Sequence, residues 1–277
     1  MEDKQILRDI IYTQSGMQLD VYLPAKVAEP LPTVVWIHGG AWKQGDKGSI
    51  AGLTPQGNAG RKPPIEVIGQ GYVLVSIDYR LSHEASFPAQ IHDCKAAIRW
   101  LRAHAGEHHI DPKRIGVWGA SAGGQLAALL GTSSDISELE GSGGNSQFSS
   151  SVQAVCDFFG PTDLLRMSEM KGELEKESPE SLYIGGPLRK NVDKVIQANP
   201  LTYISKNAPP FLIVHGDSDV VVPADQSQIL YKALLKVQVE SALHIVPGAG
   251  HGFAGASRKQ LDDIDRMVVD FFNRYLK

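Results

Sequence analysis

The feature that most constrains the fold of this chain is a set of short apolar runs separated by longer stretches with helical periodicity. The runs are rich in β-branched residues and mostly continuous, which is typical of strands buried between two layers of helices. They lie at residues 33–37, 72–77, 114–118, 152–159, 211–214 and 243–246. This alternation predicts an α/β fold with a central, mostly parallel sheet and helices on both faces.

Other segments extend this plan. Residues 5–13 and 17–23 flank a Ser15-Gly16 turn and predict an antiparallel hairpin. Apolar residues at three- and four-residue spacing predict a helix over 88–105, with Pro88 in its first turn. A closing helix is predicted from the spacing of Leu261, Ile264, Met267, Val268 and Phe271. Residues 132–151 are rich in Ser and Gly without an apolar period, which predicts a surface loop.

Residues 163–200 interrupt the alternation of strands and helices. They contain the charged run KGELEKES and a helix-like stretch at 187–198. A segment of 38 residues is too short to enclose a core of its own. We therefore expect a single α/β domain over residues 1–277, with a small lid or cap at 163–200.

Charge and hydropathy exclude several kinds of partner. The 27 Lys and Arg residues oppose 31 Asp and Glu residues, and this net charge of −4 disfavours nucleic acid and anionic membranes. No apolar run approaches the ~20 residues that a membrane-spanning helix needs. The charged start MEDKQILRD lacks the apolar core of a signal peptide, so we expect a soluble, cytoplasmic protein, or a secreted one if a leader was removed before residue 1. Two cysteines, Cys94 and Cys156, are too few for a disulfide scaffold or a four-cysteine zinc site. Each lies in apolar surroundings and is expected to be a small buried packing residue rather than a nucleophile.

The strongest chemical motif is Gly119-Ala120-Ser121-Ala122-Gly123, which follows the run ending at Trp118 and opens a helix. This is a G-x-S-x-G pattern between a strand and a helix, the setting in which the serine is a nucleophile. A sharp turn must lift the hydroxyl from the sheet edge, and only small residues fit where the two arms of the turn meet. The motif therefore predicts Ser121 as a nucleophile; the alternative is an ordinary Gly-Ser turn.

A second motif, His38-Gly39-Gly40-Ala41-Trp42, follows the apolar run that ends at Ile37. Consecutive glycines allow successive backbone N–H groups to point at one spot, where they stabilise a developing oxyanion. We expect the N–H groups of Gly40, Ala41 and Ala122 to form such an oxyanion hole. The alternative is a glycine turn without a catalytic role.

A base and an acid are expected on loops after later strands. Two carboxylates, Asp217 and Asp219, follow the run 211–214, and the motif's placement favours Asp219. His251 lies between glycines after the last run and is the expected base, whereas His215 is expected to be a turn histidine. The chain order Ser121, Asp219, His251 is that of α/β hydrolases. The remaining histidines show no paired spacing that favours metal binding: His83, His92, His104, His108, His109 and His244.

These motifs, together with WIHGGAWKQGDK, SIDYRLS, DFFGPTDL, HGDSDVVVP and GAGHGF, resemble α/β-hydrolase carboxylesterases of the esterase/lipase group related to hormone-sensitive lipase. Within that group the chain resembles bacterial feruloyl-esterase-like and acetyl-esterase-like enzymes. The resemblance implies a Ser121–His251–Asp219 triad, backbone oxyanion donors at Gly40, Ala41 and Ala122, and no metal or organic cofactor. Ala41 stands where the group usually has a third glycine.

The resemblance implies a serine carboxylesterase that acts on short-chain acyl or aryl esters, free or attached to a polymer. Trp42, Tyr79 and Phe87 lie near predicted strand ends, where they would line a substrate pocket or simply pack in the core. A short cap suggests an open cleft. Two alternatives remain: a peptidase of the prolyl-oligopeptidase type, and a hydrolase-like binding protein without catalysis.

Overall fold

A computed structural model describes residues 4–24, 26–51, 64, 71–134 and 136–277. Eight strands form one sheet in the order β1-β2-β4-β3-β5-β6-β7-β8. The strands are β1 (Lys4–Ile11), β2 (Gln18–Pro24), β3 (Leu31–Ile37), β4 (Val73–Ile77), β5 (Ile110–Ala120), β6 (Ala154–Phe158), β7 (Phe211–Gly216) and β8 (Ser241–Val246). The β1–β2 hairpin joins β4 in antiparallel pairing, and every pair from β4 to β8 is parallel. The predicted mostly parallel sheet with an N-terminal hairpin is confirmed.

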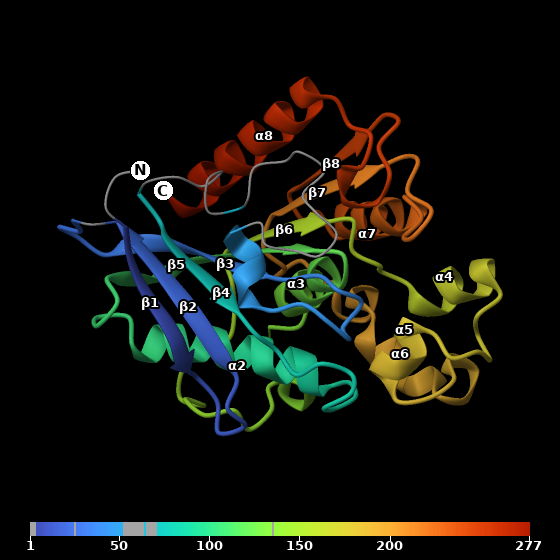
Figure 1. Cartoon of the computed structure of the whole chain (residues 1–277), viewed down its shortest axis with the longest axis horizontal. Helices are drawn as coiled ribbons and strands as arrows, with labels where there is room; N and C mark the ends of the chain where they lie inside the picture. The colour runs from blue at the N-terminus through green and yellow to red at the C-terminus, as the bar shows by residue number, and fades with distance from the viewer. Residues whose placement is uncertain (1–3, 25, 52–63, 65–70, 135) are drawn as a thin grey trace.

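Helices cover both faces of this sheet (Figure 1). The helices are α2 (Ala89–Ala103), α3 (Ala122–Thr132), α4 (Leu164–Lys171), α5 (Pro179–Ile184), α6 (Val192–Ala198), α7 (Asp225–Lys236) and α8 (Arg258–Leu276). Short 3₁₀ turns are η1 (Lys47–Ala51), η2 (Ser137–Leu139), η3 (Leu188–Lys190), η4 (Pro200–Tyr203) and η5 (His251–Phe253).

The two-residue period of the strands divides the core into two clusters. On β3, Val35 belongs to the cluster that includes residues of α2, α3 and α7, whereas its neighbours Val34 and Trp36 belong to the cluster that includes residues of α8. Because side chains alternate along a strand, an apolar run with no polar interruption supplies both clusters at once. This explains why continuous runs, rather than alternating ones, predicted the sheet.

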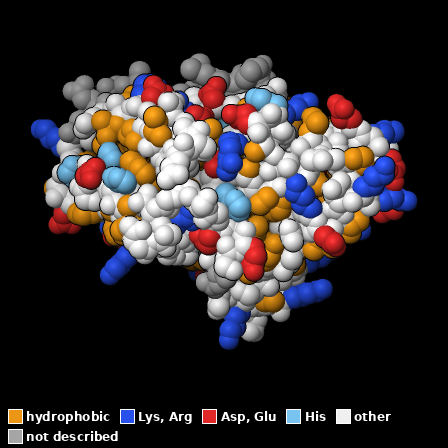
Figure 2. Space-filling model, turned by 90° about the horizontal axis from the view of Figure 1, so that it is seen from below, with side chains coloured by type: hydrophobic (Ala, Val, Ile, Leu, Met, Phe, Trp, Pro, Cys, Tyr) orange, Lys and Arg blue, Asp and Glu red, His pale blue; other side chains and the backbone are white. Residues whose placement is uncertain are grey.

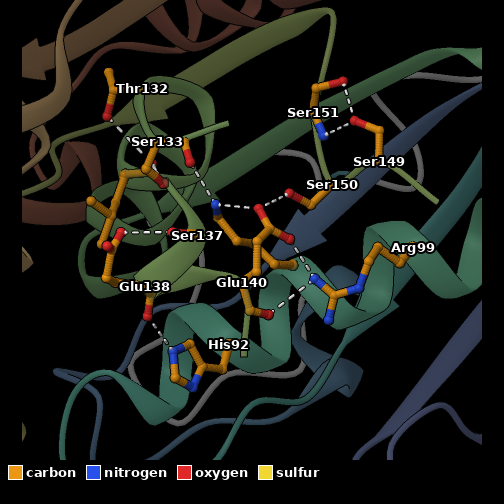
Figure 3. A network of polar contacts seen from close by, with 12 residues as sticks. His92, Arg99, Thr132, Ser133, Ser137, Glu138, Glu140, Ser149, Ser150 and Ser151 are labelled. Carbon is orange, nitrogen blue, oxygen red and sulfur yellow. Dashed lines mark hydrogen bonds and ion pairs between the residues drawn. The ribbon is translucent and has the colours of Figure 1, made fainter. Parts of the chain in front are cut away.

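The predicted surface loop at 132–151 is tied to α2 more firmly than its composition suggests (Figure 3). The Glu140 carboxylate lies 2.7 Å from the fully buried Lys95 Nζ and 2.6 Å from Arg99 Nη1. Ser150 Oγ also donates to Glu140 at 2.7 Å. Burial alone would raise the pKa of Glu140, but the hydrogen bonds from Lys95 and Ser150 lower it. The loop is therefore anchored by a partly buried ion-pair network that local composition did not reveal.

The segment 163–200 contains α4, α5, η3 and α6 and lies at one end of the molecule (Figure 1). Its side chains Leu164, Tyr183 and Leu188 are fully buried and belong to the same cluster as α3. Figure 2 shows apolar side chains among charged ones over this end; the exposed apolar residues of the segment are Met170, Leu182, Val192 and Ile196. Its role as a lid stays a prediction.

Cys94 and Cys156 are buried, as predicted. No helix within the described ranges has both the length and the apolar character needed to cross a membrane.

Candidate active site

Ser121 lies at a strained turn between β5 and α3. Its backbone has φ 56° and ψ −121°, a region that side-chain-bearing residues rarely adopt. The glycines on either side allow the close approach of the two arms. A Cβ on Gly119 would lie 2.0 Å from the carbonyl oxygen of Gly123, and a Cβ on Gly123 would lie 2.1 Å from that of Ile37. Small residues are therefore required here because a larger side chain would clash where the two arms of the turn meet.

The turn after β3 packs directly against this serine. A Cβ on Gly39 would lie 2.7 Å from the carbonyl oxygen of Ala120 and 3.3 Å from Ser121 Cβ. The next two residues, Gly40 and Ala41, have positive φ values of 111° and 54°. Ala122 is the first residue of α3, so its N–H has no acceptor within the helix by position. The structure thus brings the three expected oxyanion donors to neighbouring stretches of backbone; their role in catalysis stays a prediction.

An imidazole and a carboxylate reach Ser121 from two other loops. His251 begins η5 after β8, and its Nε2 lies 3.0 Å from Ser121 Oγ. Its Nδ1 lies 2.7 Å from Asp219 Oδ2. With Nδ1–H donated to the carboxylate, Nε2 is free to accept the proton of the hydroxyl. The three residues predicted from motifs far apart in the sequence therefore form one hydrogen-bonded chain.

Asp219 is held in place as an anion. Its Oδ1 accepts the N–H groups of Val221 and Val222 at 2.8 and 2.9 Å, and its side chain is fully buried. Burial alone would raise the pKa of Asp219, but hydrogen bonds from His215 and His251 and from nearby N–H groups lower it well below its usual value. A carboxylate that stays ionised here orients the His251 ring through the contact with Nδ1.

His215 also contacts the Asp219 carboxylate, a contact that the sequence analysis did not predict. The ring is fully buried at the end of β7, and its Nε2 lies 3.3 Å from Asp219 Oδ2 and 2.8 Å from the carbonyl oxygen of Val222. Its Nδ1 lies 2.7 Å from Ser227 Oγ. His215 is thus a turn histidine, as expected, but one that also supports the acid; its place four residues before Asp219 was the available signal.

Asp217, the competing carboxylate, does not meet His251. Its Oδ1 accepts the backbone N–H of Gly248 at 2.7 Å and the hydroxyl of Ser218 at 3.0 Å. The side chain therefore ties the loop after β7 to the loop after β8.

The three aromatic residues considered as pocket lining are buried in the core. Trp42, Tyr79 and Phe87 expose only 2%, 1% and 1% of their surfaces. Trp42 stacks on Tyr183 with ring centroids 4.4 Å apart, and Phe87 meets the same ring edge-on. Tyr79 stacks on His38 at 4.3 Å and donates its hydroxyl to the His38 carbonyl. Rings packed in this way leave no surface for a ligand, so the packing alternative is the better account of all three.

The chain is similar to several proteins named as esterases. It matches the BD-FAE family over residues 19–234. It is 31% identical over 257 residues to the esterase LipC of Mycobacterium tuberculosis, an alignment that covers 89% of this chain and 59% of LipC. It spans 49% and 61% of LipM and LipQ from the same organism. The chain thus corresponds to about half to three-fifths of the length of these curated relatives.

Solved structures with the α/β-hydrolase fold resemble nearly the whole chain. A truncated carbohydrate esterase from gut microbiota superposes with a TM-score of 0.80 at 31% identity, covering 97% of this chain and 96% of that one. Esterase 2 of Thermogutta terrifontis phosphonylated by sarin superposes with a TM-score of 0.74 at 26% identity, covering 98% of this chain and 95% of that one.

Proposed function

Because this chain belongs to the BD-FAE family and has the α/β-hydrolase fold, we propose that it is a serine carboxylesterase. The single observation that carries the proposal is the contact of Ser121 Oγ with His251 Nε2 at 3.0 Å, continued to Asp219 at 2.7 Å. The named esterase activities of its relatives support the same reaction class, and so does the structural relative that sarin phosphonylates.

In the proposed mechanism, Ser121 Oγ attacks the ester carbonyl carbon while His251 Nε2 takes the hydroxyl proton. Backbone N–H groups of Gly40, Ala41 and Ala122 hold the oxyanion of the tetrahedral intermediate. The intermediate collapses as the C–O bond to the alcohol breaks, and His251 returns the proton to the departing oxygen. Water, deprotonated by His251, then attacks the acyl-enzyme and releases the acid and Ser121.

We further propose that the acyl group is short or aromatic, of the acetyl or feruloyl type. The similarity to a carbohydrate esterase supports esters carried on a sugar or a polymer. Val220 and Val221, next to Asp219, expose 88% and 49% of their surfaces and offer apolar contact beside the acid. The segment 163–200 is proposed to act as the small cap of this site.

The test is hydrolysis of p-nitrophenyl acetate by the wild type and by Ser121→Ala. We expect turnover to fall by about four orders of magnitude, because removing the nucleophile leaves only binding and oxyanion stabilisation. Ser218→Ala is the matched control, since Ser218 is an exposed serine whose hydroxyl donates a hydrogen bond to Asp217. Unchanged hydrolysis by Ser121→Ala would refute the proposal.

Substrate class is tested with p-nitrophenyl esters from C2 to C12, methyl ferulate and acetylated xylan. We expect the highest kcat/KM at C2 to C4 or with the ferulate ester. An optimum at C10 or C12 would contradict the proposed acyl preference. Cleavage of a prolyl p-nitroanilide with no ester turnover would instead indicate the peptidase alternative.

A further inference from the structure

Gln125 joins three parts of the site through one buried amide. It lies in the first turn of α3, where its backbone N–H donates to the Ser121 carbonyl at 3.0 Å. Its Oε1 accepts the indole N–H of Trp42 at 3.1 Å and, at the longer distance of 3.4 Å, the hydroxyl of Tyr183. Its Nε2 donates to the carbonyl oxygen of Ala198 at 2.7 Å, and the side chain is fully buried. The nucleophile helix is thereby linked to the turn after β3, to α5 and to the end of α6.

The chemistry of the partners determines the orientation of this amide. An indole N–H can only donate and a backbone carbonyl can only accept, so Oε1 must face Trp42 and Nε2 must face Ala198. Burial raises the pKa of Tyr183 well above its usual value, so its hydroxyl keeps the proton that it donates. If the amide were rotated by 180°, its NH₂ group would face the Trp42 N–H and its oxygen would face the Ala198 carbonyl, so both hydrogen bonds would be lost.

Trp42 in turn holds a strained stretch of backbone. Ala41 and Trp42 have φ values of 54° and 56°, a region that side-chain-bearing residues rarely adopt. The Trp42 ring stacks on Tyr183 with an interplanar angle of 8°, and the Trp42 carbonyl accepts the N–H of Ser82 at 2.8 Å. Trp42, the residue directly after Ala41, is thus held through both its ring and its backbone.

We propose that Gln125 is a positioning residue for the oxyanion turn. Its hydrogen bond with Trp42 sets the direction of the Gly40 and Ala41 N–H groups relative to Ser121. Its hydrogen bond with Ala198 makes that direction depend on the position of the segment 163–200. The inference rests on the esterase function proposed above. Because the oxyanion exists only in the transition state and the intermediate, a misdirected turn should lower kcat with little change in KM.

The test compares Gln125→Met with Trp42→Phe. Methionine has similar length but no acceptor, and phenylalanine keeps an aromatic ring on Tyr183 but loses the N–H. With p-nitrophenyl acetate we expect each to lower kcat by roughly 10- to 100-fold, below the effect of deleting a direct oxyanion donor, with KM within about twofold. The double variant should be within about threefold of the worse single variant, because both changes cut the same hydrogen bond.

The matched control is Gln226→Met, which removes another fully buried glutamine. Its Oε1 accepts the N–H groups of Thr162 and Asp163 at 2.9 and 2.7 Å, away from the oxyanion turn. It should lower the melting temperature while keeping kcat within about threefold of the wild type. Equal kcat losses in Gln125→Met and Gln226→Met, or a loss confined to KM, would overturn the inference.

The two proposals fail in different ways. Esterase activity that survives Ser121→Ala would refute the proposed function. Loss of activity in Ser121→Ala together with wild-type kcat in both Gln125→Met and Trp42→Phe would refute only the role of Gln125.

Discussion

We predict that His38 lowers the stability of the folded protein in mildly acidic solution. The ring is 1% exposed and stacks on Tyr79, and its Nδ1 lies 2.7 Å from the Gly39 carbonyl oxygen, to which it must donate. Within the described part of the chain, Nε2 has no hydrogen-bond partner. Protonation at Nε2 would therefore bury a positive charge and an unsatisfied N–H. Burial accordingly lowers the pKa of His38 to about 4, although the Gly39 carbonyl and Asp46 act in the opposite direction.

The size and sign of the effect follow from this pKa. The pKa of His38 is about 4 in the folded state, against 6.5 for an unperturbed histidine in the unfolded chain. Between these values the unfolded chain binds a proton that the folded protein does not, so the free energy of unfolding falls as the pH falls. The separation corresponds to about 3 kcal/mol at pH 4 and below, a large part of the ~5–15 kcal/mol that stabilises an ordinary protein.

The measurement is urea denaturation of the wild type and His38→Asn at pH 7 and pH 4. Asparagine does not titrate, and its amide N–H can take the place of Nδ1–H toward Gly39. The unfolding free energy of the wild type minus that of His38→Asn should fall by about 3 kcal/mol from pH 7 to pH 4. Contributions from all other titrating groups cancel in this difference. A difference that stays constant between the two pH values would refute the reasoning.

Four further substitutions test other polar side chains. Burial raises the pKa of Asp157 to about 6, so its ionisation destabilises the fold as the pH rises. Asp157→Asn should therefore gain about 2 kcal/mol in unfolding free energy relative to wild type between pH 4 and pH 8, as measured by urea denaturation. Asp219→Asn should lower kcat for p-nitrophenyl acetate by about 10⁴-fold and Asp217→Asn by less than tenfold; the reverse order would exchange their roles. Glu140→Gln should lower the unfolding free energy by about 3–5 kcal/mol, because the buried Lys95 ammonium loses its carboxylate, and a loss under 1 kcal/mol would contradict this.

The sheet and the turn that carries Ser121 were predictable because their signals are local. A strand buried on both faces needs a continuous apolar run, and a serine at φ 56° needs neighbours without bulk, as Gly119 and Gly123 provide. Each requirement involves residues a few positions apart. The positions of Ser121, Asp219 and His251 then followed because carboxyl ends of parallel strands meet at one edge of the sheet.

Contacts between distant side chains left no comparable signal. Glu140 pairs with Lys95 across 45 positions, and nothing in the Ser- and Gly-rich sequence around Glu140 indicates this anchor. The position of Trp42 after a predicted strand indicated that its ring lies near the site. It did not indicate whether the ring faces a pocket or the core. Its direction depends on Gln125 and Tyr183, which belong to elements far along the chain.

The same close packing that permits the proposed chemistry also explains how a strained site persists. Ser121 and Ala41 both have positive φ, and neither conformation is favourable for an isolated residue. Gly39 and Gly123 bring the backbones of the two turns so near that a single Cβ would clash, so neither turn can relax without displacing the other. The strain at one turn is thus opposed by packing against the other, and the hydrogen-bond donors stay directed before any substrate arrives. Such preorganisation avoids the cost of reorienting dipoles during the reaction, which is why we expect losses of packing here to reduce kcat before they unfold the protein.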